Sequence, residues 1–169
     1  MDTIKYFAYI CLGLAGVGLI VTLAEEPAFI VPTLVLLVTG VLLTALDKII
    51  TTLVVLAAIL FIVNGLRWLV DPAGIVDMFG LELASGVGLS SQVGDMSAFF
   101  LTLGICMLMG VVAAEHLWFY PAMLLLGLTT VGRILAWLVH DAALAAHLIA
   151  PEVIITLILW IASRRLRDN

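Results

Sequence analysis

The sequence predicts an all-α, polytopic membrane helix bundle with about six transmembrane helices. The first observation is composition: 64% of the 169 residues are hydrophobic and only 11% are charged, with a mean hydropathy of +1.30. A soluble domain is about half apolar and about a quarter charged. This chain therefore has too few polar residues to cover a water-facing surface. The second observation is spacing, because apolar runs of membrane-spanning length alternate with short charged or proline-containing breaks.

Six apolar runs define the predicted helices. They cover residues 4–23, 28–46, 49–70, 96–114, 119–139 and 152–163. The first run is longer than the apolar core of a cleaved signal peptide, so we interpret it as a retained helix. The last run is short, and the apolar link 142–150 could contribute to it. The breaks that end the first five runs are Glu25–Glu26–Pro27, Asp47–Lys48, Asp71–Pro72, Glu115–His116 and His140–Asp141.

The chain divides into an N-terminal transmembrane hairpin, residues 1–47, and a four-helix membrane core, residues 48–169. This division follows from the polar residues within the apolar runs, nearly all of which belong to the last four helices. Between the third and fourth helices, residues 71–95 contain five glycines but are too apolar for a solvated loop. We therefore expect an interfacial or re-entrant segment over about residues 72–94.

Charge asymmetry predicts the orientation. Five basic residues lie at one set of helix ends, whereas the opposite loops carry acidic residues and no Lys or Arg. The basic residues are Lys5, Lys48, Arg164, Arg165 and Arg167. The positive-inside rule then predicts a multi-pass protein of the bacterial inner membrane with both termini in the cytoplasm. The formal net charge of −5 argues against nucleic acid as a partner.

Arg133 is the most informative single residue. It lies 14 residues after Phe119, about 20 Å along the fifth predicted helix. An unpaired guanidinium is costly at that depth, and Asp95 and Glu152 begin helices on the same side. We therefore predict a polar cluster on the outer side of the membrane. Its members are Arg133, Asp95, Glu152, His140, Asp141, Arg67 and Asn64.

The cluster has a structural and a functional interpretation. It could be an ion-pair network that pins three helices, or a site for a ligand, such as a wet vestibule, a pocket for an anionic head group or a metal site. His140 and His147 are chemically suitable metal ligands, but they lack tight HxxH or HxxxH spacing. We predict no metal and no cofactor.

Motifs of catalysis are absent from the sequence. It contains no GxSxG elbow and no glycine-rich phosphate loop, so we predict no catalytic residue and favour a protein that is not an enzyme. Cys11 and Cys106 both lie in apolar runs, where a packing role is the simpler interpretation.

Small residues recur every four positions along the fourth predicted helix. They are Gly94, Ala98, Thr102, Cys106, Gly110 and Ala114. Such a stripe allows another helix to approach closely. Because Asp95 begins this helix beside the stripe, we favour packing within the chain, although packing against another subunit stays open.

Short motifs between residues 64 and 165 resemble a family. They are Asp71–Pro72, then Met78–Phe79–Gly80–Leu81, Gly94–Asp95 before Ala98–Phe99–Phe100, Gly132–Arg133 and Pro151–Glu152. In these elements the chain is similar to bacterial membrane proteins that share a domain of unknown function, loosely of the DoxX-like four-helix type. The resemblance implies a four-helix core with Arg133 and Glu152 as family features, and it implies no activity. Gln92–Val93–Gly94–Asp95 departs from the acidic-x-Arg-Gly element of many members.

Three functions are compatible with these features, and we favour the first over the two alternatives. The first is a non-enzymatic scaffold or accessory subunit in the lipid bilayer, forming a homo-oligomer or a membrane complex, because almost the whole chain is predicted to lie in the membrane. The second is a carrier or channel for a small solute, an ion or a lipid that uses the Arg133 cluster. The third is a redox or quinone-linked membrane subunit, suggested by the DoxX-like resemblance.

Overall fold

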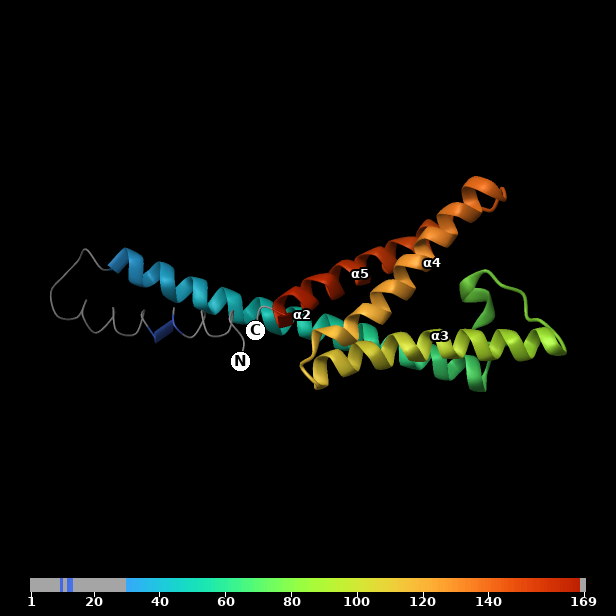
Figure 1. The fold of residues 1–169 in the computed structure, drawn as a ribbon, viewed down its shortest axis with the longest axis horizontal. Coiled ribbons are helices and arrows are strands. Elements are labelled where there is room, and N and C mark those ends of the chain that lie inside the picture. Colours follow the sequence, from blue (N-terminus) through green and yellow to red (C-terminus); the bar gives the residue numbers. More distant parts are fainter. Residues whose placement is uncertain (1–9, 11, 14–29, 168–169) are drawn as a thin grey trace. The chain divides into compact units, whose positions relative to one another are not determined.

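The computed structural model describes residues 10, 12, 13 and 30–167, which contain helices and no strand. The all-α prediction is therefore confirmed for this part of the chain. The elements are α2 (Ile30–Val70), η2 (Val76–Phe79), α3 (Val87–Val112), η3 (His116–Trp118), α4 (Phe119–Val139) and α5 (Ala146–Arg167) (Figure 1). Within the described residues, four helices are long and apolar enough to cross a membrane.

The chain forms two compact units. Unit 1 comprises residues 1–52 and 164–169, and unit 2 comprises residues 53–163. The predicted first helix, 4–23, lies outside the described residues except at positions 10, 12 and 13. The predicted N-terminal hairpin, residues 1–47, therefore stays a prediction.

In unit 1, one predicted helix boundary is wrong. Asp47 and Lys48 do not end a helix, because α2 continues through both residues. The Lys48 carbonyl accepts a hydrogen bond from Thr52 Oγ1 at 2.8 Å, and the Asp47 carboxylate pairs with Arg165. A charged pair interrupts hydropathy but removes no backbone hydrogen bond, unlike proline. Six separate helices are consequently not supported by the described part of the chain.

In unit 2, α2 and α3 pack backbone to backbone. A Cβ atom on Gly104 would lie 2.6 Å from the Ala58 carbonyl oxygen and 2.9 Å from the Ile62 nitrogen. A Cβ atom on Gly65 would likewise lie 2.9 Å from the Leu101 nitrogen. Helices approach this closely only where one of them presents no side chain. Gly65 and Gly104 therefore set the distance between α2 and α3.

The predicted small-residue stripe does not form one face of α3. Cys106 and Gly110 are buried, whereas Gly94, Ala98 and Thr102 are exposed. Ala114 lies beyond the end of α3 and has a φ of 51°. With 3.6 residues per turn, a strict four-residue spacing drifts by about 40° per step. The stripe accordingly winds from one side of the helix to another.

The segment between α2 and α3 is shorter than predicted. It contains η2, whose Val76 is buried, and it ends at Gly86, since α3 already begins at Val87 rather than at Met96. Gln92 stabilises this earlier start. Its side chain accepts a hydrogen bond from the Ala84 nitrogen at 3.0 Å and donates one to the Glu82 carbonyl at 3.1 Å. Gly88, which the predicted interfacial or re-entrant segment included, therefore lies inside the helix, as does Gly94.

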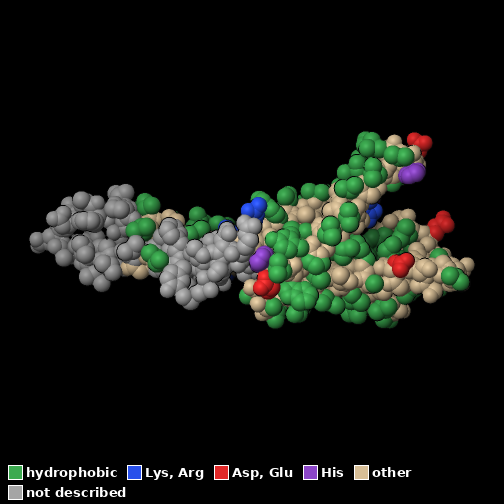
Figure 2. All heavy atoms as spheres, in the orientation of Figure 1, with side chains coloured by type: hydrophobic (Ala, Val, Ile, Leu, Met, Phe, Trp, Pro, Cys, Tyr) green, Lys and Arg blue, Asp and Glu red, His purple; other side chains and the backbone are tan. Residues whose placement is uncertain are grey.

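The last two helices meet the prediction more closely. α4 has the predicted bounds, and α5 begins at Ala146 with Pro151 inside it, so the link 142–150 does contribute to this helix. Large apolar side chains cover the outside of both helices, including Leu124, Leu128 and Leu157. Figure 2 shows acidic side chains toward the two ends of unit 2, with a mainly hydrophobic or uncharged surface between them. A bilayer would solvate such a surface.

Candidate ligand-binding site

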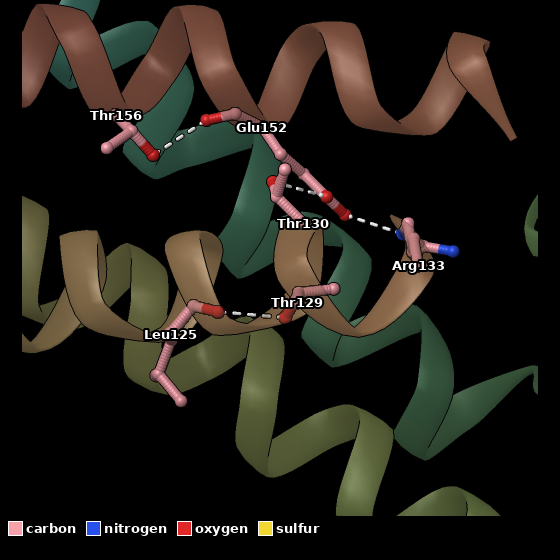
Figure 3. Close-up of polar contacts among 6 residues, drawn as sticks. All are labelled: Leu125, Thr129, Thr130, Arg133, Glu152 and Thr156. Atoms are coloured by element: carbon pink, nitrogen blue, oxygen red, sulfur yellow. Dashed lines mark hydrogen bonds and ion pairs between the residues drawn. The ribbon is translucent and has the colours of Figure 1, made fainter. Parts of the chain in front are cut away.

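An ion pair joins α4 to α5 inside unit 2. Arg133 Nε donates to Glu152 Oε1 at 3.0 Å, and Thr130 Oγ1 donates to Glu152 Oε2 at 3.0 Å (Figure 3). Both carboxylate oxygens are therefore satisfied. The Glu152 side chain is 13% exposed and that of Arg133 is 29% exposed. Low exposure strengthens such charge-assisted hydrogen bonds relative to surface pairs.

The helix registers bring these side chains together. Thr130 and Arg133 are three residues apart on α4 and so share a face. Arg133 lies six residues before the end of α4, and Glu152 lies six residues after the start of α5. At 1.5 Å per residue, each is about 9 Å from the helix end where α4 turns into α5. Their equal depth allows a direct ion pair across the two helices.

The neighbouring hydroxyl groups are satisfied within their own helices. Thr129 Oγ1 donates to the Leu125 carbonyl at 2.8 Å, and Thr156 Oγ1 donates to the Glu152 carbonyl at 2.7 Å. Bonds of this i−4 type are the usual solution for threonine in an apolar helix. The hydroxyl groups of Thr129 and Thr156 therefore donate to backbone carbonyls and not to the Glu152 carboxylate.

A cavity of about 330 Å³ lies beside the ion pair. Its walls are mostly apolar, with one basic and one acidic side chain among them. The lining residues are Phe79, Leu81, Asp95, Met96, Phe99, Phe100, Thr129 and Arg133. Figure 1 shows α3 and α4 separating toward the end of unit 2 that contains residues 71–86 and 140–145, which we call the cavity end.

Arg133 reaches the cavity with unused donors. A guanidinium has five N–H donors, and Glu152 takes only the one on Nε. The two terminal amino groups have no partner among the residues that the structure describes. Figure 3 shows that the end of the side chain points away from Glu152. The cavity thus contains a positive group with free hydrogen-bond donors.

Asp95 faces the same cavity from α3 but does not pair with Arg133. It lies eight residues after Val87, about 12 Å from the start of α3 and so at a depth similar to that of Arg133. No ion pair within 4.0 Å joins Asp95 to a cationic side chain in the described part of unit 2. The predicted network of three helices is therefore a two-helix ion pair with a separate carboxylate.

Arg67 stabilises the wall of the cavity instead of entering it. Its Nη2 donates to the Gly74 carbonyl at 2.7 Å, and Asp71 Oδ1 accepts from the Gly74 nitrogen at 3.1 Å. These contacts attach the segment before η2 to the end of α2. Phe79, at the end of η2, then packs against Phe100 with ring centroids 5.0 Å apart. Asn64 lies on α2 and is not among the cavity residues.

The predicted histidines lie away from the cavity lining. His140 follows the last residue of α4, where its backbone nitrogen bonds to the Ala136 carbonyl at 3.0 Å, and Asp141 has a φ of 53°. His147 is exposed on α5. The described residues contain no group of three or more His, Cys, Asp or Glu side chains that could hold a metal ion.

The aromatic walls are the part of the site that sequence reasoning missed. Met78–Phe79–Gly80–Leu81 and Ala98–Phe99–Phe100 were noted as motifs but not as parts of the Arg133 site. The signal was their position next to Asp95 in the chain, since Phe99 follows Asp95 by one helical turn. Phe79 could not be found this way, because only the path of the η2 segment brings it to α3.

The described residues thus define a class: a helical chain with four helices apolar enough to cross a membrane and a charged, aromatic-walled cavity at one end. Comparison with known family models, curated proteins and solved structures finds no match. The resemblance to the DoxX-like type therefore stays a prediction.

Proposed function

We propose that this protein binds a membrane lipid through its phosphate-bearing head group, in the cavity lined by Arg133. This is the lipid form of the carrier interpretation. The observation that carries it is the set of free donors on Arg133 within mostly apolar walls. A phosphate offers the acceptors that a guanidinium binds best.

Energetics favour an acceptor in the cavity. A guanidinium in a membrane is costly unless it is neutralised and hydrogen-bonded. Glu152 compensates the charge of Arg133 but uses one of its five donors. Water or a ligand must serve the others, and a phosphate serves two of them at once. The Glu152 and Thr130 contacts hold the guanidinium in position for such a ligand.

The surroundings favour a lipid over a soluble anion. Large apolar side chains cover the outside of α4 and α5, so the cavity lies among surfaces suited to acyl chains. Its volume of about 330 Å³ is at the lower end for ligand pockets. That volume accommodates a head group and the start of the chains. The remaining acyl length would then lie along the helices.

Lipid retention tests the proposal. The protein is purified in mild detergent with a phosphatidylglycerol and phosphatidylethanolamine mixture, and bound lipid is counted by native mass spectrometry. Arg133→Gln should lower occupancy at least about tenfold, the loss expected when a charge-assisted contact worth about 1.4 kcal/mol or more is removed. Arg165→Gln is the matched control, because Arg165 pairs with Asp47 in unit 1 and does not line the cavity.

A second variant covers the case in which Arg133→Gln fails to fold. Met96→Trp adds bulk to the cavity wall without changing a charge, and it should also displace the lipid. Unchanged occupancy in both variants would contradict the proposal and favour an ion pair that only joins two helices.

The scaffold interpretation has less support. The close small-residue contacts at Gly65 and Gly104 lie within unit 2, and exposed apolar faces are what a bilayer alone requires. Neither feature favours a partner subunit. The cavity accordingly carries more functional information than the helix faces.

We also propose a location in the bacterial inner membrane with the C-terminus in the cytoplasm. Arg164, Arg165 and Arg167 support this orientation, as do the acidic residues of the cavity end. Labelling of single cysteines at positions 141 and 169 in a cysteine-free background tests the C-terminal half. The reagent should reach position 141 from outside.

A further inference from the structure

Asp95 is the second charged group in the cavity. It lies on α3 and is exposed, and its carboxylate has no hydrogen-bond or ion-pair partner in the part of the chain that the structure describes. The phosphate-binding proposal uses Arg133 and gives Asp95 no role. A carboxylate at membrane depth is costly without a partner.

The charges of the site disfavour a ligand that is only anionic. Arg133 and Glu152 compensate each other, which leaves Asp95 as an additional negative charge beside the cavity. A phosphate bound at Arg133 would bring a second negative charge into the same volume of about 330 Å³. Like charges brought together in a binding site repel each other and weaken binding. A ligand that also carries a cation removes this repulsion.

We propose that the cavity selects a zwitterionic phospholipid with a primary ammonium group. The phosphate binds Arg133, and the ammonium group binds Asp95. This inference rests on the proposed function, because it assigns the lipid class to the same cavity. Charge complementarity carries it: the two charged side chains that line the cavity have opposite signs and lie on different helices, α3 and α4.

The chemistry of the walls agrees with a cation. The rings of Phe79, Phe99 and Phe100 line the cavity with Asp95, and aromatic faces attract ammonium groups. A carboxylate additionally accepts N–H hydrogen bonds from a primary ammonium group, whereas a quaternary ammonium group has no N–H donor. Asp95 therefore favours phosphatidylethanolamine over phosphatidylcholine.

Lipid competition tests the inference. Wild-type protein is equilibrated with equal amounts of phosphatidylethanolamine, phosphatidylcholine and phosphatidylglycerol, and bound lipids are resolved by native mass spectrometry. We expect phosphatidylethanolamine to exceed each competitor about tenfold, which corresponds to about 1.4 kcal/mol. Asp95→Asn, which keeps the side-chain shape, should reduce this ratio to about one for phosphatidylglycerol while lipid stays bound. Asp77→Asn is the matched control, since Asp77 is an exposed acid of η2 outside the cavity lining.

Several outcomes would overturn the inference. Equal binding of the three lipids by the wild-type protein would do so without any variant, as would an unchanged ratio in Asp95→Asn. Displacement of lipid by free phosphoethanolamine at equal concentration would reject a lipid as the ligand. If the wild-type protein shows no preference among the three lipids but its lipid occupancy still depends on Arg133, only the selection of a zwitterionic lipid is refuted. Occupancy independent of Arg133 refutes the proposed function itself.

Discussion

The same two helices, α3 and α4, pack closely at one end of unit 2 and are separated by a cavity at the other. At the end that contains residues 113–118, which we call the turn end, α3 and α4 are in close contact: Phe119 is buried, and its ring occupies the place that a Cβ atom on Gly110 would need. At the cavity end the same helices separate, and a cavity remains between Phe99 and Phe100 on one side and Thr129 and Arg133 on the other. At the turn end, the absence of a side chain on Gly110 allows close packing. At the cavity end, aromatic and charged side chains surround an open space.

Each end of unit 2 also has one glutamate that contacts a basic side chain. Glu115 pairs with His116 at the turn end with Oε1 and Nδ1 3.1 Å apart, and the glutamate side chain is 47% exposed. Glu152 pairs with Arg133 at the cavity end and is 13% exposed. Water competes for the first pair and is largely excluded from the carboxylate of the second. The same chemical group is thus in an exposed contact at one end and in a shielded ion pair at the other, where we expect the larger contribution to stability.

The largest expected effect is at the turn end. Gly110→Ala places a methyl group inside the Phe119 ring, and the ring must leave its buried position. We expect a loss of about 3 kcal/mol, at the upper end for overpacking of a core. Thermal unfolding in detergent measures it. Gly127→Ala on α4 is the matched control, because nothing lies within 4 Å of its Cβ position, and that variant should keep or raise the melting temperature. Equal melting temperatures for both variants would contradict the close packing.

An intermediate effect is expected at the cavity end. Glu152→Gln leaves the Arg133 charge uncompensated and keeps one acceptor oxygen for Arg133 Nε, while its amide N–H can donate to Thr130 Oγ1. We expect a loss of about 1–2 kcal/mol, since both side chains are only partly exposed. Thermal unfolding again measures it. Phosphatidylglycerol occupancy should not fall, because the change removes a negative charge beside the cavity. A melting temperature like that of the wild type would show that the pair contributes nothing to stability.

The smallest effect is expected from the same substitution at the turn end. Glu115→Gln removes the exposed carboxylate that contacts His116 Nδ1 and keeps an oxygen that can accept from the Leu117 nitrogen, now at 3.3 Å. Exposed pairs contribute about 0–1 kcal/mol. The melting temperature should therefore change less than in Glu152→Gln. A larger change than in Glu152→Gln would reverse the proposed contrast between the two ends.

Much of the helical content follows from hydropathy and its breaks. Residues 119–139 form α4 as predicted, and the end of α2 at Val70 agrees with the break at Asp71–Pro72. The prediction failed at Asp47–Lys48, where charges interrupt the apolar run but the backbone stays helical. It also placed the start of α3 too late, because the side-chain contacts of Gln92 with the preceding segment are not visible in a hydropathy pattern.

The candidate site was predictable in part. The need of Arg133 for an acidic partner follows from its depth in an apolar helix, and Glu152 was one of two partners within reach. Which of the two it takes depends on the relative rotation and separation of α3, α4 and α5. The same geometry leaves Asp95 unpaired. It also brings Phe79 to the cavity, although Phe79 lies about 50 residues before Thr129 and Arg133 in the sequence.

The sequence by itself determined that the chain is helical and apolar enough for a membrane, and that an arginine within an apolar helix requires compensation, because both follow from the cost of exposing polar groups to lipid. The tertiary structure decided where α3 and α4 touch and where they separate, because that depends on side-chain volumes at facing positions such as Gly110 and Phe119. The cavity with Arg133 and Asp95 is a result of that packing, and no single segment of the sequence contains it.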